Sequence, residues 1–141
     1  MPMRKINPFK LRSFRGIDQE IIARLEAAGI KTTLQMLKAG QTDEMRAALA
    51  KFAGIPLGAV LELVKLSDLA RLPGVKGIRA RLYYEAGVDS VEKLAEYRPD
   101  DLLSLTGEFV RKTGFEGIAP LPKEVSSTIE TARKLPKVVE W

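Results

Sequence analysis

The residues best suited to chemistry in this sequence are basic side chains that follow a glycine near the middle of the chain. Lys76, Arg79 and Tyr83 occupy positions i, i+3 and i+7, which places them on one stripe of a helix. Lysine and arginine bind phosphate groups, and a tyrosine ring can lie against a sugar. The stripe therefore predicts contact with a phosphate-bearing partner. The alternative is a solvated helix face with Tyr83 half-buried at its edge.

Residue types that are missing exclude most catalytic chemistry. The sequence contains no histidine and no cysteine, so it lacks the usual general base near neutral pH, the thiolate nucleophile and the commonest zinc ligands. Asp100 and Asp101 stand at the start of an expected helix, where they complement the helix dipole without any catalytic role. We therefore expect a protein that is not an enzyme, with no tightly bound transition metal and no cofactor.

Composition indicates a globular protein with a slight preference for anionic partners. The chain has 141 residues, of which 45% are hydrophobic, and 23 basic against 18 acidic residues give a net charge of +5. No apolar run is long enough to cross a bilayer, and the basic N-terminal segment lacks the apolar stretch of a secretory signal. We expect a cytoplasmic location, no membrane partner, and one compact domain.

The sequence contains an internal repeat. FRGIDQEIIARLEAAGI at residues 14–30 resembles LPGVKGIRARLYYEAGV at residues 72–88, and three apolar or glycine positions match at a spacing of 58 residues. The matched pairs are Gly16 with Gly74, Gly29 with Gly87, and Ile30 with Val88. We therefore predict a first repeat over residues 1–66, and a second over 67–141 that includes a C-terminal helix and tail.

Capping residues and apolar spacing predict helices throughout, with no sustained alternation typical of strands. Expected helix starts are Asp18, Thr32 or Thr33, Thr42, Pro56, Ser90, Pro99 and Pro122, and Ser67 is expected to cap a short turn. The side chains expected to be buried are Ile17, Ile21, Leu25, Val75, Ile78 and Leu82. We also expect Val138, Val139 and Trp141 to pack against the body of the protein.

A helix, a tight turn containing an apolar residue after a glycine, and a second helix form the helix-hairpin-helix signature. Such a turn exposes the free amides at the start of its second helix, which can hold a backbone phosphate without reading bases. We predict a nucleic-acid-binding site at the second turn, comprising Gly74, Val75, Lys76, Gly77, Arg79, Arg81 and Tyr83. The first turn, with Gly16 and Ile17, is a secondary candidate. The fold class predicted is all-α, with two tandem helix-hairpin-helix repeats packed into one compact helical domain.

Several short motifs carry a resemblance to a known family. They are Asp68-Leu69-Ala70-Arg71-Leu72, Ala86-Gly87-Val88-Asp89-Ser90-Val91, Leu94-Ala95, Arg98-Pro99, Leu121-Pro122 and the tail Lys134 to Trp141, with Arg46-Ala47-Ala48-Leu49-Ala50 to Gly54-Ile55 in the first half. With them the chain resembles an uncharacterised bacterial and archaeal family of tandem helix-hairpin-helix proteins, a domain of unknown function. More distantly, the repeats are similar to helical N-terminal DNA-binding domains of recombinases. The resemblance implies the fold and a nucleic-acid partner.

Two features of the turns bear on this hypothesis. A phosphate-binding hairpin usually reads Gly-apolar-Gly, whereas Lys76 and Asp18 stand here in place of the second glycine, and Gly77 could substitute by a shift of one residue. The second turn is followed by more basic than acidic residues and the first by more acidic than basic ones. We therefore expect the second turn to dominate nucleic-acid binding, and we keep a protein–protein interaction module on the same fold as the alternative.

Overall fold

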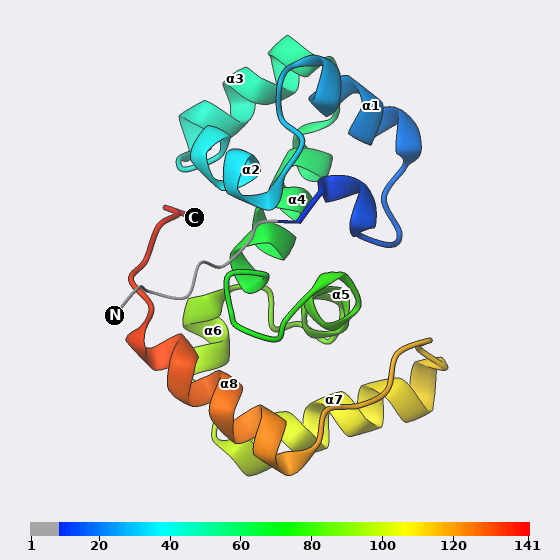
Figure 1. The fold of residues 1–141 in the computed structure, drawn as a ribbon, viewed down its shortest axis with the longest axis vertical. Coiled ribbons are helices and arrows are strands. Elements are labelled where there is room, and N and C mark those ends of the chain that lie inside the picture. Colours follow the sequence, from blue (N-terminus) through cyan, green and yellow to red (C-terminus); the bar gives the residue numbers. More distant parts are fainter. Residues whose placement is uncertain (1–8) are drawn as a thin grey trace.

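The structure, a computed structural model, describes residues 9–141, and within this range the expectation of an all-helical fold is confirmed (Figure 1). The only extended pairing in the described range is an isolated antiparallel bridge between Lys10 and Thr32. No helix in this range is long and apolar enough to cross a membrane. The elements are the 3₁₀-helix η1 (Leu11–Ser13) and the α-helices α1 (Gln19–Ala27), α2 (Thr33–Ala39), α3 (Asp43–Ala53), α4 (Leu57–Leu69), α5 (Gly77–Glu85), α6 (Val91–Ala95), α7 (Pro99–Thr113) and α8 (Pro122–Lys134).

Most helices begin where the capping residues predicted. The hydroxyls of Thr42 and Ser90 each accept a hydrogen bond from the amide three residues later, at 3.1 Å in both cases. Thr32 forms a full capping box with Gln35. Pro99 and Pro122 occupy the first positions of α7 and α8, where a missing amide hydrogen costs nothing. These starts depend on local chemistry, so the sequence alone can predict them.

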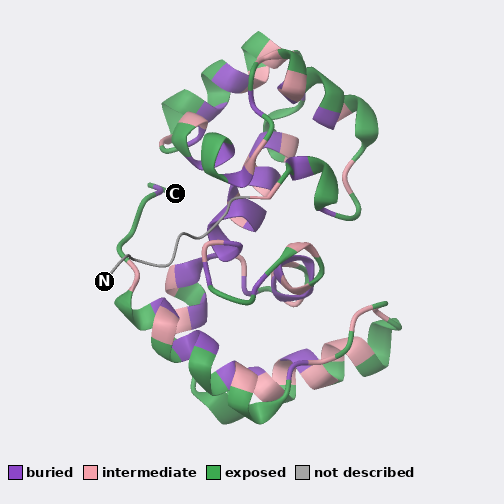
Figure 2. Ribbon diagram, viewed as in Figure 1, coloured by how far each residue is buried: buried purple, intermediate pink, exposed green. Residues whose placement is uncertain are grey.

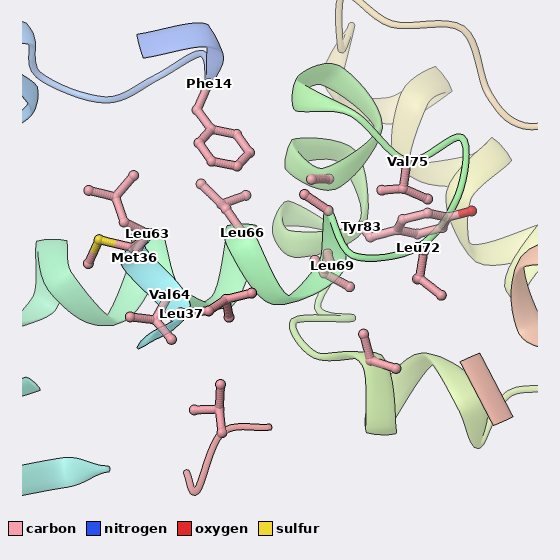
Figure 3. Close-up of a cluster of buried hydrophobic side chains, with 14 of the residues drawn as sticks. Phe14, Met36, Leu37, Leu63, Val64, Leu66, Leu69, Leu72, Val75 and Tyr83 are labelled. Carbon is pink, nitrogen blue, oxygen red and sulfur yellow. The ribbon is translucent and has the colours of Figure 1, made fainter. Parts of the chain in front are cut away.

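Helix α4 lies at the centre of the molecule. It packs against α2 and α3 at one end and against α5 at the other, and Figure 3 shows buried side chains from both ends around it. Because α4 is apolar on nearly its whole circumference, it can be covered from several directions at once. Leu63, Leu66 and Leu69 are fully buried. Helix α4 therefore joins the two ends of the chain into one core.

The position of Ser67 corrects one expectation. It lies inside α4 and is fully buried, so it does not cap a separate turn. The helix continues to Leu69 because the apolar spacing of its residues extends past Ser67 without a break. The boundary predicted between residues 66 and 67 consequently falls within a continuous helix, and the division into two repeats stays a prediction.

The last helices form a layer on the other side of α5. Helix α8 packs against both α6 and α7, and its inward face carries Val125, Ile129 and Ala132 (Figures 1 and 2). The opposite face of α8 is exposed, because this helix is amphipathic and its polar residues lie on that face. The tail after α8 returns toward α2 and α3, where Val139 is buried as expected and Val138 is exposed.

Turn geometry matches between the two halves of the chain. Gly16 and Gly74 adopt φ angles of 79° and 82°, and each stands three residues before a helix of nine residues. Gly29 and Gly87, at φ angles of 87° and 97°, follow those two helices. Positive φ is a conformation that glycine adopts readily and other residues rarely do. The matched spacing of the glycines in the sequence thus corresponds to matched backbone conformations.

Burial agrees only in part with the predicted core. Leu25, Val75 and Leu82 are buried as expected, whereas Ile17 and Ile21 are half-buried. Ile78 is 42% exposed, so the prediction of a buried Ile78 is wrong. The reason is its place in the first turn of α5, where the side chain faces the loop after α7 rather than α4.

A partly buried ion pair between Asp89 and Lys65 makes the stability of this fold depend on pH. Burial alone would raise the pKa of Asp89, but hydrogen bonds and charges from Lys65 and Lys93 outweigh burial and lower it. Because the pKa of Asp89 is lower in the folded than in the unfolded protein, its ionised form stabilises the fold at pH values above the ordinary aspartate pKa. This stabilisation is lost as the pH falls through the pKa of the folded state. Asp89→Asn should therefore reduce the free energy of unfolding at neutral pH by about 1 kcal/mol. Urea denaturation should show this difference shrinking below pH 3.8, the ordinary aspartate pKa. The control is Glu96→Gln at an exposed position; a difference that persists in strong acid would contradict the ion-pair explanation.

Close packing of η1 on α5 requires a glycine at position 77. A Cβ atom added there would lie 2.8 Å from the backbone oxygen of Ser13, which cannot move as a side-chain end could. Gly77→Ala should therefore lower the free energy of unfolding by about 1–3 kcal/mol. Gly107→Ala is the matched control, because Gly107 lies inside α7 with nothing within 4 Å of an added Cβ. That control should stabilise the protein by up to about 1 kcal/mol, and equal losses in both variants would refute the packing argument.

Candidate functional site

The second turn is exposed at its glycine and anchored at the residue that follows. Gly74 is exposed, and an added Cβ there would meet no atom within 4 Å. Val75 is buried, and its amide donates a hydrogen bond to the Leu72 oxygen at 3.0 Å. The valine therefore fixes the turn on the core, while the glycine leaves its outer surface open to a ligand.

The start of α5 lacks the cap that the corresponding helix of the first half has. At α1, the Asp18 carboxylate accepts a hydrogen bond from the Glu20 amide at 2.8 Å. At α5, Lys76 stands in the capping position and no side chain accepts a hydrogen bond from the first-turn amides. Free amides and the positive end of the helix dipole favour an anion at this position. The two turns therefore differ in what they can accept, although their backbones match.

Two of the predicted basic residues are engaged inside the protein. Arg79 pairs with Glu124 at 2.7 Å and donates a hydrogen bond to the backbone oxygen of Ile118. Arg81 pairs with Glu62 at 2.6 Å, and its side chain is only 7% exposed. The expectation that Arg81 faces a ligand is therefore wrong. Lys76, in contrast, is exposed and forms no ion pair with any residue from 9 to 141.

Tyr83 belongs to the hydrophobic core. It is fully buried, and Figure 3 shows its ring near Leu72 and Val75. Burial raises the pKa of Tyr83 to about 12, with smaller and opposing effects from Arg79 and Glu124. The prediction that the Tyr83 ring lies against a sugar is thus wrong, and so is the alternative that Tyr83 is half-buried at the edge of a solvated face. Helix α5 is covered by α4, the first turn and the loop after α7, so most of its circumference is buried.

The first turn packs directly on α5, the helix that follows the second turn. Besides the contact of Ser13 with Gly77, a Cβ at Gly16 would lie 3.3 Å from the Arg81 guanidinium. This packing gives Gly16 a structural role, and Ile17 is half-buried beside it. The sequence indicates matched turns but carries no signal that they touch.

An open groove of about 860 Å³ lies along the two turns. The first turn contributes Ser13 and Arg15, and the second turn with the start of α5 contributes residues 73, 74 and 76–79. The opposite side is formed by residues 116–118, Glu124 and Thr128. Arg15, which the sequence analysis missed, pairs with Glu116 across the groove. With Arg15, Lys76 and Arg79 against two glutamates, the groove carries a net charge of +1.

The basic residues near the N-terminus, Arg4, Lys5, Lys10 and Arg12, could have extended this groove if they folded against the second turn, but those in the described part of the chain do not. Arg12 pairs with Glu26 at 2.9 Å, and Lys10 is exposed without lining the groove. Arg4 and Lys5 lie outside the described residues. Residues 9–141 contain no cluster of three acidic side chains placed to hold a metal ion. Within that range, the groups in the groove that could bind a ligand are one lysine, the free amides at the start of α5, and two arginines that are already paired with glutamates.

A structural role for Arg81 can be separated from a ligand role by measuring stability. Arg81→Ala removes one partner of a buried pair and should lower the free energy of unfolding by about 3 kcal/mol. Arg111→Ala is the control, because its pair with Glu108 is exposed and should contribute less than about 1 kcal/mol. Denaturation of Arg81→Ala/Glu62→Ala should show a loss smaller than the sum of the single losses. Additive losses would mean that Arg81 and Glu62 do not stabilise each other.

Comparison with known proteins places the chain in a family. No curated protein and no solved structure matches it. The family model described as "Domain of unknown function (DUF4332)" matches residues 15–135, which include every α-helix of the described part of the chain and all residues that line the groove except Ser13. The expected similarity to an uncharacterised family is thereby confirmed. The chain belongs to the family of proteins that carry this domain of unknown function, DUF4332.

Proposed function

We propose that this protein is a cytoplasmic, non-catalytic nucleic-acid-binding module made of two tandem helix-hairpin-helix repeats. In this proposal the second turn holds the sugar-phosphate backbone without reading base sequence. The observation that carries the proposal is the uncapped start of α5, with the exposed Lys76 beside it. A phosphate would accept hydrogen bonds from the first-turn amides and pair with the lysine.

The repeat interpretation is supported by the paired turns. Gly16 and Gly74 share a positive φ and the same distance to the next helix, and Gly29 and Gly87 end those helices alike. This pattern is what a duplicated helix-hairpin-helix unit requires, and a distant similarity to the DNA-binding domains of recombinases is part of the same proposal. Helix α4 would then serve as the last helix of one repeat and the first helix of the next.

Charge favours the second turn over the first. The Asp18 carboxylate already occupies the amides of α1 and would repel a phosphate. At the second turn no side chain accepts a hydrogen bond from the first amides of α5, although Gly77 itself, in place of the second glycine of the usual hairpin, packs against the backbone of Ser13. We therefore assign phosphate binding to the second turn alone.

The number of free basic groups limits the strength of binding. Arg79 and Arg81 neutralise glutamates of the chain, so Lys76 is the main unpaired cation at this turn within the described residues. Each phosphate contact contributes about one unit to the slope of log affinity against log salt. We therefore expect weak binding with a slope of about 1–2, well below that of proteins with a broad basic face.

A protein–protein interaction module is the second candidate, and exposed apolar side chains favour it. Ile118 is 82% exposed and Leu121 is 69% exposed, and Ile118 lines the same groove as Ile78. Apolar groups of this size contribute little to binding a phosphate backbone, whereas they are typical of protein interfaces. If the protein binds a partner with an affinity that rises or stays constant as salt is added, that result would favour the protein–protein interaction module.

The direct test is fluorescence anisotropy with labelled single- and double-stranded DNA of mixed sequence, at about 50 and about 150 mM NaCl. Lys76→Glu should weaken binding about fivefold or more, because loss of one charge contact with a phosphate already costs about 1 kcal/mol in water and the new glutamate adds repulsion. It should also flatten the salt slope by about one unit. Unchanged affinity and slope would place the site elsewhere.

Lys51→Glu is the matched control for this test. Lys51 is exposed on α3, outside the groove, and the substitution changes the net charge by the same amount. It should leave affinity nearly unchanged, and circular dichroism should show both variants folded. Equal weakening by the two variants would indicate a general charge effect, and absence of DNA binding at low salt would move the protein-interaction candidate to first place.

A further inference from the structure

The last six residues form an extended segment that packs across the body of the protein. After α8 the chain turns extended at Leu135 and runs toward α2 and α3 (Figure 1). The Glu140 amide donates a hydrogen bond to the Gln41 oxygen at 2.7 Å, and Arg46 donates to the Glu140 oxygen at 2.9 Å. The segment is therefore recognised through its backbone, much as an extended peptide is recognised by a binding protein.

Two side chains of this segment are also recognised. Val139 is buried, although its neighbours in the chain are exposed. The Trp141 indole nitrogen donates to Glu92 at 3.2 Å, and its ring lies 5.6 Å from the Arg46 guanidinium and 5.5 Å from the Lys65 ammonium. In an extended chain residues two apart point the same way, so both side chains face the body together.

The body holds its side of this contact in place by bonds of its own. Arg46 is nearly fully buried and also donates to the Gly40 oxygen at 2.9 Å, and Lys65 pairs with Asp89. Arg71, which donates to the Pro136 oxygen, is fixed by the buried Asp68 at 2.9 Å. Because these partners belong to the helical body, the receiving surface is formed without the segment.

The segment itself has one buried side chain, that of Val139. Lys137, Val138 and Glu140 are exposed, and Trp141 is 36% exposed. Burial of one valine is a small gain for ordering a stretch without helical or sheet hydrogen bonds. The segment also lies beyond residues 15–135, which the family model covers. These observations describe a preformed surface occupied by an extended segment that has no regular secondary structure of its own.

We propose that this surface, the tail groove formed by Gln41, Arg46, Lys65, Arg71 and Glu92, is a peptide-binding site that the chain's own tail occupies. Its ligand would be an extended segment of another protein that carries an aliphatic residue two positions before an aromatic one. In the tail, Val139 is the aliphatic residue and Trp141 is the aromatic one. In the observed contact a peptide amide donates to the Gln41 oxygen and the peptide oxygen of the same residue accepts from Arg46, a donor and acceptor pair that an extended peptide supplies.

The tail competes with such a partner because it is tethered. A tethered ligand acts at a high effective concentration, so an outside peptide binds well only when the tail is released. Val139→Asp in the full chain should release it, since burying a carboxylate in place of the valine carries a large cost in desolvation. The groove residues remain unchanged in this variant.

The experiment measures binding of a fluorescein-labelled peptide with the sequence of residues 133–141, its terminus amidated, by fluorescence anisotropy. The Val139→Asp chain should bind this peptide at least about tenfold more tightly than the unmodified chain does. Circular dichroism must show the variant folded, and Trp141→Gly serves as a second released chain if it is not. A folded released chain that fails to bind the peptide, or binds no better than the unmodified chain, overturns the proposal.

Peptide variants test the chemistry of the ligand without affecting folding of the chain. Peptides with Val139→Asp or Trp141→Ala should bind at least about tenfold more weakly, since each loses a central contact. A peptide with Lys137→Ala, at an exposed position, is the control and should bind unchanged. Equal binding of all four peptides would show a non-specific contact. If light scattering shows the unmodified chain forming dimers that Val139→Asp abolishes, the groove belongs to a second copy and the proposal fails.

Discussion

Burial of α4 on nearly all sides is the constraint on which the rest of the structure depends. Most residues of this helix from Val60 to Leu69 are buried, although the helix is thirteen residues long and lies between two groups of helices. Covering it requires α2 and α3 at one end and α5 at the other. The position of the second turn follows from this arrangement, because that turn begins directly after α4 and is anchored by Val75 on the same core.

The charges of the protein are used mostly within the chain. The sequence has an excess of basic residues, yet Arg15, Arg46, Arg71, Arg79 and Arg81 all have carboxylate partners in the described range. A net charge of +5 therefore does not translate into a basic face at the groove. Of the cations that line the groove, Lys76 alone has no carboxylate partner among residues 9–141, which is why a weak anion site and an apolar interface are compatible with the same groove.

Local chemistry accounts for what the sequence could predict, and distant contacts account for what it could not. Caps such as Thr42 and the glycine at position 74 depend on neighbours within a few residues, and both were predicted. Burial of Tyr83 and Arg81 depends on residues far along the chain, including Glu62 and the first turn at Gly16. Helical spacing gives the stripe on which a side chain lies, but α5 is covered from several directions, so one stripe could not describe its buried surface.

The continuity of α4 also sets the relative orientation of the two ends of the molecule. A helix advances about 1.5 Å and turns about 100° with each residue. One residue inserted between Leu63 and Leu69 would therefore rotate everything after it by more than a quarter turn relative to α2 and α3. The tail groove draws on residues from both sides of such an insertion, including Arg46 and Glu92, and it would come apart. The length of this helix is consequently under tighter constraint than the identity of most of its residues.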